Sequence, residues 1–438
     1  MFVRRLVLHS TCLTLEGNEF SMDKMCALQK TLLAFCLFAS AMASPIETDV
    51  ALQAVAQGAQ LFSVNFIKTV GAEQKEQENN LISSPLSAHI ALSMASEGAA
   101  GTTEAQFREV LNLPSKSQSL IGFQNLIGIL NNVENVTLKL ANKLFIGEGF
   151  PVKSQYKQDL QTYYYSDIAS VDFSQNVNAA NIINTWCKEK TNNRIESIVE
   201  PGDLSPSLAL VLANAVYFKG NWANQFDPKA TTDRPFHVNA NTVKQVPTMY
   251  RKGNYKYVEL PEHKAKCIEL PYANSEISMV IVLPDEVDGL GALINNLEQV
   301  STECNVRLAR SYEREVKLYL PKFKTESTLN LGDTLSKKLG LPEPFSNSAN
   351  FNGISDVPVK IDKVIQKAFI EVNEEGSEAA AVTVLFLAES AFIQMDTVVS
   401  IDRPFYYAIV KSVNTHVQTK PHDIITLFSG YVIEPIIN

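Results

Sequence analysis

The most constraining feature of this sequence is a segment near the C-terminus that contains no glycine or proline from Ser377 until Pro404. The segment opens with small, helix-tolerant residues. Its middle, residues 382–387, is rich in β-branched and aromatic residues, which favour strands. This composition suits an exposed loop in one state of the protein and a strand of a sheet in another.

Helical spacing dominates the first half of the chain. Apolar residues recur every three or four positions from Val55 to Val70 and predict an amphipathic helix. A short strand at residues 81–83 precedes a second helix, for which Ser84 or Ser87 is the candidate cap and Pro85 suits the first turn. Further helices are expected over residues 104–111 and 179–191.

Strands dominate the second half. Residues 208–218 are almost wholly apolar, as in a central strand buried on both faces. The sequence lacks a regular alternation of strands and helices, which argues for an α+β fold with large, mainly antiparallel sheets. Other strands are expected at residues 136–145, 279–283, 316–320, 405–410 and 424–433, the last of them turning at Ser429-Gly430.

Composition limits the class of protein. The chain has 438 residues, of which 45% are hydrophobic and 19% charged, which is typical of a globular protein with a large core. Its formal net charge of −9 disfavours binding to nucleic acid or to an acidic membrane, because both require clustered Lys and Arg.

The N-terminal region predicts a secretion signal at about residues 22–43. Lys30 precedes the apolar run 31–38, and the small residues that follow end at Ala43, where cleavage would leave a chain starting at Ser44. The run is well short of the roughly 20 residues that span a bilayer. Residues 1–21 lie upstream of a complete signal, so we expect translation to start at Met22 or Met25, or an alternative first exon. We predict a secreted, extracellular protein.

Cysteine usage does not indicate a disulfide scaffold. After removal of residues 1–43, Cys187, Cys267 and Cys304 remain, and an odd number leaves at least one thiol free or paired with another molecule. The sequon Asn135-Val136-Thr137 predicts a glycan on Asn135 in a secreted protein.

Catalytic and metal-binding motifs are lacking in the sequence. There is no Gly-x-Ser-x-Gly, His-Glu-x-x-His, Walker-type or Gly-x-Gly-x-x-Gly pattern. His263 and Cys267 have a spacing of four, but no second ligand pair accompanies them. We therefore expect no metal, no cofactor and no enzymatic activity.

Five motifs in order along the chain resemble those of the serpins, a family of serine protease inhibitors. Within the family, the sequence resembles secreted insect serpins most. The resemblance covers the chain from about residue 50 to the end and implies one domain over residues 44–438. It implies several helices around three β-sheets, with a large central sheet and an exposed reactive-centre loop at about residues 374–402. The motifs are Ser84-Pro85-Leu86-Ser87, residues 213–222, residues 316–323, Asp402-Arg403-Pro404-Phe405 and Leu427-Phe428-Ser429-Gly430.

The resemblance implies a suicide mechanism, in which a target protease attacks the loop and the loop then inserts into the central sheet. In an inserted strand side chains alternate between faces. Residues 377, 379, 381, 383, 385 and 387 share one face and are small or apolar, whereas Glu378 lies on the other. This composition is that of an inhibitor. The implied hinge residues are Glu374, Glu375, Gly376, Ser377, Glu378, Ala379, Ala380, Ala381, Val382 and Thr383.

The usual spacing in the family places the scissile bond between Ser390 and Ala391, with Phe392 and Met395 as alternatives for the residue before the bond. A small Ser390 suits an elastase-like target, and Phe392 or Met395 a chymotrypsin-like one. No Lys or Arg occurs between Glu374 and Asp402, which disfavours trypsin-like targets.

The family also has a buried polar network that controls sheet opening, matched here by Ser84, Ser87, Asn214, Trp222 and Gln366. Gln366 stands where the family often has a histidine, and an amide can still donate and accept hydrogen bonds. The region around residues 116–130 lacks a basic stripe, so activation by heparin is not expected.

The sequence leaves alternative functions open. The leading interpretation is a monomeric inhibitor whose partner is an elastase- or chymotrypsin-like serine protease. One alternative is an inhibitor of a cysteine protease. Another is a non-inhibitory serpin that acts as a carrier or chaperone.

N-terminal sequencing of the secreted protein tests the predicted leader. We expect a single N-terminus at Ser44. A secreted chain that begins at Phe2 would contradict the prediction.

Overall fold

The computed structural model describes residues 45–75, 79–376, 397–413 and 424–437. The chain forms two compact units, Met1–Glu47 and Thr48–Asn438, and the larger one contains both sheets. The family fold class predicted from the sequence, α+β with several helices around large sheets, is confirmed. The predicted leader at residues 22–43 lies outside the described residues.

Most helices precede the strand-rich half, as the sequence pattern predicts. The described α-helices are α3 (Pro45–Lys75), α4 (Pro85–Glu97), α5 (Gly101–Val110), α6 (Lys116–Asn131), α7 (Ser154–Tyr163), α8 (Asn176–Lys190), α9 (Leu290–Asn295) and α10 (Leu297–Arg310). Short 3₁₀ or π turns are η1 (Pro201–Asp203), η2 (Pro228–Ala230), η3 (Pro261–His263), η4 (Thr334–Lys338) and η5 (Glu343–Phe345).

The strands form a five-stranded sheet and a nine-stranded sheet. The five-stranded sheet has the order β10 (Phe323–Asn330), β11 (Ile361–Val372), β4 (Leu210–Gly220), β2 (Val136–Gly147), β3 (Ile168–Val171). The nine-stranded sheet has the order β1 (Leu81–Ser83), β14 (Ile424–Val432), β13 (Phe405–Ser412), β8 (Ile277–Pro284), β7 (Ala265–Pro271), β6 (Thr242–Leu260), β9 (Glu313–Pro321), β12 (Thr397–Ser400), with β5 (Thr232–Asn239) also beside β6.

The resemblance to the serpins implies three sheets. In the structure, the long strand β6 joins the two smaller ones into the nine-stranded sheet. The strand β6 is 19 residues long. Its residues 256–260 pair with β7, its middle residues 248–256 with β9, and its first residues 242–248 with β5. The two smaller sheets are therefore hydrogen-bonded into one.

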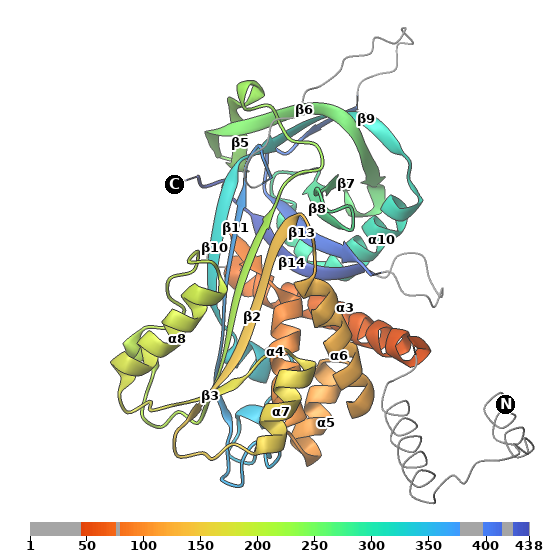
Figure 1. Cartoon of the computed structure of the whole chain (residues 1–438). Helices are drawn as coiled ribbons and strands as arrows, with labels where there is room; N and C mark the ends of the chain where they lie inside the picture. The colour runs from red at the N-terminus through yellow and green to blue at the C-terminus, as the bar shows by residue number, and fades with distance from the viewer. Residues whose placement is uncertain (1–44, 76–78, 377–396, 414–423, 438) are drawn as a thin grey trace, which may run out of the picture. The chain divides into compact units, whose positions relative to one another are not determined.

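The five-stranded sheet is covered on both faces (Figure 1). On one face, Ile183 and Trp186 of α8 pack against Phe145 and Val211. On the other, α4 packs against β2 and β4 within the main core. The strand β4 is buried along almost its whole length, as its apolar sequence predicts.

Local sequence signals set the helices beneath the sheet. Ser84 caps α4 by accepting a hydrogen bond from the Ser87 backbone N–H, and Pro85 occupies the first turn. The apolar face of α3 is buried through Val55 and Phe66. Residues Ile46–Gln74 are long and apolar enough to cross a bilayer by length and composition, a property that buried core helices share.

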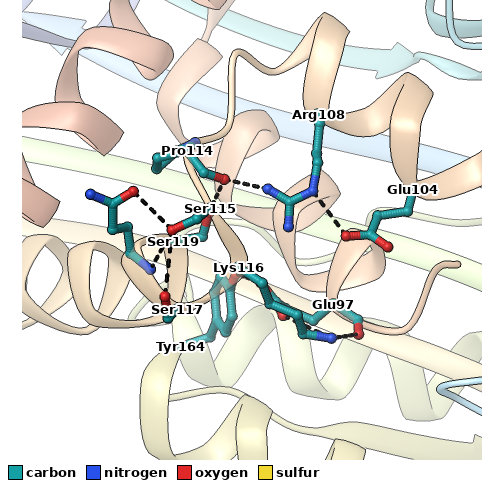
Figure 2. A network of polar contacts seen from close by, with 10 residues as sticks. Glu97, Glu104, Arg108, Pro114, Ser115, Lys116, Ser117, Ser119 and Tyr164 are labelled. Atoms are coloured by element: carbon teal, nitrogen blue, oxygen red, sulfur yellow. Dashed lines mark hydrogen bonds and ion pairs between the residues drawn. The ribbon is translucent and has the colours of Figure 1, made fainter.

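A polar cluster joins α4, α5 and α6 where these helices meet (Figure 2). Lys116 Nζ donates to the Glu97 carbonyl at 2.9 Å and lies 3.5 Å from the Glu97 carboxylate, to which Tyr164 also donates. Burial raises the pKa of Glu97, although Lys116 and Tyr164 act in the opposite direction. The single cation of α6 is thus paired with Glu97, although its side chain is about half exposed (51%).

The cysteines divide into a pair and a buried thiol. Cys267 in β7 and Cys304 in α10 form a disulfide with a Cα–Cα distance of 6.1 Å. Cys187 is buried and free, and burial raises the pKa of its thiol to about 12. His263 does not form a metal site with Cys267 in the described structure; its Nε2 lies 2.9 Å from Glu303 Oε2.

The expected turn at Ser429-Gly430 is wrong, because β14 runs through both residues. Glycine serves there for close approach: a Cβ on Gly430 would lie 1.9 Å from the Leu81 carbonyl oxygen of β1. Asn135, the predicted glycan site, is exposed and adopts a φ of 60° just before β2.

His89 lies in the core between helices. Its ring is fully buried between Phe62 and Phe123, and Nε2 is 2.8 Å from the Leu111 carbonyl oxygen. Burial lowers the pKa of His89 from 6.5 to about 4, although the hydrogen bond to Leu111 acts in the opposite direction. Because the unfolded chain takes up this proton more readily, the contribution of His89 to stability is full above pH 6.5 and declines as the pH falls toward 4.

Replacing His89 by glutamine should reduce the sensitivity of the fold to acid. Between pH 7.5 and pH 5 the wild type should lose about 2 kcal/mol more unfolding free energy than His89→Gln. Urea denaturation at both pH values measures this difference. Ser93→Ala, a buried change in the same helix that adds or removes no titrating group, is the control. Identical pH dependence in wild type and His89→Gln would refute the assignment.

Candidate functional site

The centre of the five-stranded sheet contains a seam between two parallel strands (Figure 1). Strands β11 and β4 are hydrogen-bonded directly, from Ile361 opposite Leu210 to Phe369 opposite Tyr217, with one register shift between Ile361 and Lys363. Beyond that point the ladder ends, while β11 stays paired with β10 as far as Val372. The seam is therefore closed along most of its length and unpaired at one end.

A buried amide cluster bridges the seam midway. Gln366 of β11 lies directly opposite Asn214 of β4, which lies opposite Asn142 of β2. Gln366 Nε2 donates to Asn214 Oδ1 at 2.7 Å and to the Ser84 carbonyl at 2.9 Å. Gln366 Oε1 accepts from the Ser84 backbone N–H at 2.8 Å. One glutamine thus satisfies three polar groups in the core.

The cluster extends from the seam to α4 and to the nine-stranded sheet. Asn214 Nδ2 donates to Ser87 Oγ and to Asn142 Oδ1. Ser84 Oγ donates to the Leu427 carbonyl of β14 at 2.6 Å. Movement at the seam would therefore disturb the start of α4 and the last strand of the chain.

A second cluster holds the chain where β11 ends. The Glu374 carboxylate lies 2.8 Å from Lys322 Nζ and accepts from Thr231 Oγ1 at 2.7 Å. Burial opposes the charged form, but the hydrogen bonds from Lys322 and Thr231 outweigh it and lower the pKa of Glu374. The carboxylate is therefore held charged at the open end of the seam.

Trp222 fixes the backbone of the same segment. Its Nε1 donates to the Asn373 carbonyl and its backbone N–H to the Glu375 carbonyl, both at 3.0 Å. Its ring stacks on Tyr272 at a centroid distance of 4.6 Å. Gly376 has a φ of +89°, and a Cβ there would lie 2.3 Å from the Trp222 nitrogen, so only glycine fits.

The structure brings together most of the predicted network. Ser84, Ser87, Asn214 and Gln366 form one hydrogen-bonded cluster. Trp222 differs: its hydrogen bonds go to the hinge residues Asn373 and Glu375, and among the described residues none joins it to that cluster. Asn214 lies within β4 and reaches the middle of the seam, whereas Trp222 follows β4 and lies at the end of the seam. The order of residues along the chain could not show this difference.

Three members of these clusters were missed by the sequence analysis. Asn142 could have been noticed as an amide inside a strand that is otherwise half apolar. Lys322 lies inside a quoted motif, but nothing local indicates that it pairs with Glu374. Thr231 carries no sequence signal that we can identify.

The remaining predicted site residues lie outside the described part of the chain. These are the hinge residues from Ser377 to Thr383, the predicted bond Ser390–Ala391 and the alternatives Phe392 and Met395. The chain leaves the described part at Gly376 and re-enters it at Thr397, where β12 pairs in parallel with β9.

Comparison with known proteins places this site in context. The family described as "Serpin (serine protease inhibitor)" matches residues 57–424. Alaserpin of Manduca sexta is 34% identical over 92% of this chain and 100% of its own length. Antitrypsin of Bombyx mori is 36% identical over 73% of this chain and 81% of its own.

A solved structure agrees in fold. Serpin48 of the insect Tenebrio molitor, described as highly specific, has a TM-score of 0.75 at 31% identity. The match covers 87% of this chain and 98% of that one.

Removing the amide of Gln366 should destabilise the intact protein. Gln366→Leu leaves the Ser84 N–H, the Ser84 carbonyl and Asn214 Oδ1 buried without their partner. We expect the free energy of unfolding in urea to fall by about 2–4 kcal/mol. Gln161→Leu, at an exposed glutamine on α7, is the matched control. A loss for Gln366→Leu no larger than that of the control would show that the cluster does not hold the seam.

Proposed function

The chain belongs to the serpin family, and on that premise we propose that it is a secreted inhibitor that traps an elastase- or chymotrypsin-like serine protease by loop insertion. Serpins inhibit proteases and are not catalysts, so this protein is not an enzyme. The observation that carries the proposal is the direct parallel pairing of β4 with β11, next to the start of the hinge at Glu374–Gly376.

The geometry of the seam suits insertion of the following segment. A chain that leaves the end of β11 and turns back would run antiparallel to both β11 and β4. It would replace one parallel ladder by two antiparallel ones, in which pairing is slightly more stable per residue. Ser377 to Ser390 comprises fourteen residues, and β11 has twelve, so the segment is long enough to fill the seam.

The hinge cluster supports a gate at the point of entry. Insertion begins beside Glu374, which Lys322 and Thr231 hold in place. The amide cluster at Gln366 and Asn214 lies further down the seam and must separate as the strand advances. Both clusters keep the seam closed until cleavage frees the segment.

The loop sequence supports the target class. Insertion buries the small and apolar set that begins with Ser377, and Ser390 before the proposed bond suits an elastase-like primary pocket. A shift of the bond to Phe392 or Met395 would suit a chymotrypsin-like one. The name of the relative Antitrypsin refers to that protein; this chain lacks a basic residue between Glu374 and Asp402.

Secretion and the remaining partners rest on other features. The apolar run 31–38 and the exposed turn at Asn135 support a secreted glycoprotein. Lys116, the one cation of α6, is bound to Glu97, which supports independence from heparin. We propose a monomer that meets only its target protease.

Complex formation on a denaturing gel tests the proposal. The mature protein is mixed with elastase or with chymotrypsin and boiled in SDS. We expect a band near the summed mass and release of a C-terminal peptide that begins at Ala391. Ser377→Arg should be cleaved without forming the complex, because insertion would bury a charge.

The matched control is Glu378→Arg, a charge on the opposite face of the inserted strand. It should form the complex at close to the wild-type yield. Equal yields from Ser377→Arg and wild type would contradict the burial argument. Cleavage of the wild type without a complex and without a rise in melting temperature would favour a carrier, and trapping of a cysteine protease alone would favour the cross-class alternative.

A further inference from the structure

The sheet next to the reactive segment has a mixed aromatic and basic outer face. Strands β12, β9 and β6 lie side by side, and their register forms rows across the sheet. Their buried side chains, which include Leu318 and Val399, alternate with side chains on the outer face. The outer rows are Val398, Lys317 and Lys252, and Ser400, Tyr319 and Tyr250.

Arg234 of β5 completes this face. Its guanidinium carbon lies 4.0 Å from the centroid of the Tyr319 ring, and the rings of Tyr319 and Tyr250 are 4.9 Å apart. Stacking on an aromatic ring fixes the plane of a guanidinium while leaving its N–H donors at the edge. Among the residues that the structure describes, no carboxylate pairs with Arg234. The guanidinium of Arg234, stacked on Tyr319, therefore presents N–H donors that suit a carboxylate.

The surroundings favour an acidic ligand. Arg234, Lys252 and Lys317 bring three cationic side chains to this part of the sheet, and Lys252 Nζ lies 2.7 Å from the Glu315 carboxylate. The whole chain carries a net charge of −9, so a positive patch of this kind differs from the average surface. Val398 is 54% exposed and lies at the edge strand β12.

A protease bound to the loop must come close to this face. Thr397, the first residue of β12, follows Ser390 by seven positions in the chain, which span at most about 25 Å when extended. A protease domain of roughly 240 residues has a diameter of about 45 Å. Its body therefore extends over the strand where the loop rejoins the sheet.

We propose that Arg234, Tyr319, Tyr250 and Lys317 form a secondary docking surface that binds a carboxylate at the rim of the target protease. This inference rests on the proposed function and adds a determinant of specificity outside the loop. The loop selects by its fit to the primary pocket. The Arg234 surface selects among proteases by the charge at the rim of the protease. Such charge complementarity mainly changes the rate at which the two proteins associate.

The test compares an anionic and a cationic chymotrypsin as probes. With the anionic enzyme, Arg234→Ala should lower the second-order rate constant of inhibition roughly fivefold or more at low salt, and less at high salt. With the cationic enzyme the rate should be nearly unchanged. The stoichiometry of inhibition and the melting temperature should not change, because loop insertion is untouched. Arg234→Lys should recover only part of the rate, since an ammonium cannot reproduce the planar fork.

Arg194→Ala is the matched control, at an exposed arginine that follows α8 in the chain. The helix α8 lies away from β5 and β9 (Figure 1). Equal rates for wild type and Arg234→Ala with the anionic enzyme would overturn the docking surface while leaving the inhibitor intact. An equal loss with both enzymes would overturn it as well, because charge would not be the cause. If wild type forms no SDS-stable complex with either probe, the proposed function fails first, and the docking surface fails with it.

Discussion

The direct pairing of β4 with β11 is the constraint on which the rest of the structure depends. Both strands are buried along most of their length, so each N–H and C=O at the seam must find a partner in the fold. Parting the strands without a replacement would leave a row of these groups unpaired. In the proposed mechanism, opening and insertion would therefore proceed together, each step of separation being matched by new backbone hydrogen bonds. The segment that follows the hinge would provide them without a second molecule.

Two side-chain clusters hold the sheet closed at the seam. At the end of the seam, Lys322 and Thr231 hold Glu374, and Trp222 holds the backbone on either side of it. Midway, the amide of Gln366 serves three partners at once. These contacts are local to the closed state and raise the barrier to opening.

Local pattern predicted the elements well and their long-range contacts poorly. The apolar run of β4, the Ser84 cap and the need for glycine at Gly376 follow from short stretches of sequence. The pairing of Glu374 with Lys322 joins a residue that follows β11 to one that lies between β9 and β10, and only the sheet topology shows that they meet. Ser429-Gly430 was misread as a turn because glycine was there to let β1 approach.

The last strand of the chain has a consequence for the order in which the protein can fold during synthesis. β14 lies between β1 and β13, Ser84 Oγ is bonded to Leu427, and Tyr431 reaches Gly71. These partners are separated by 343 and 360 residues. At about 5–20 residues per second, translation leaves the parts of α3 and α4 that contact β14 without this partner for roughly 15–70 s. The nascent chain therefore needs protection from aggregation until its C-terminus emerges from the ribosome.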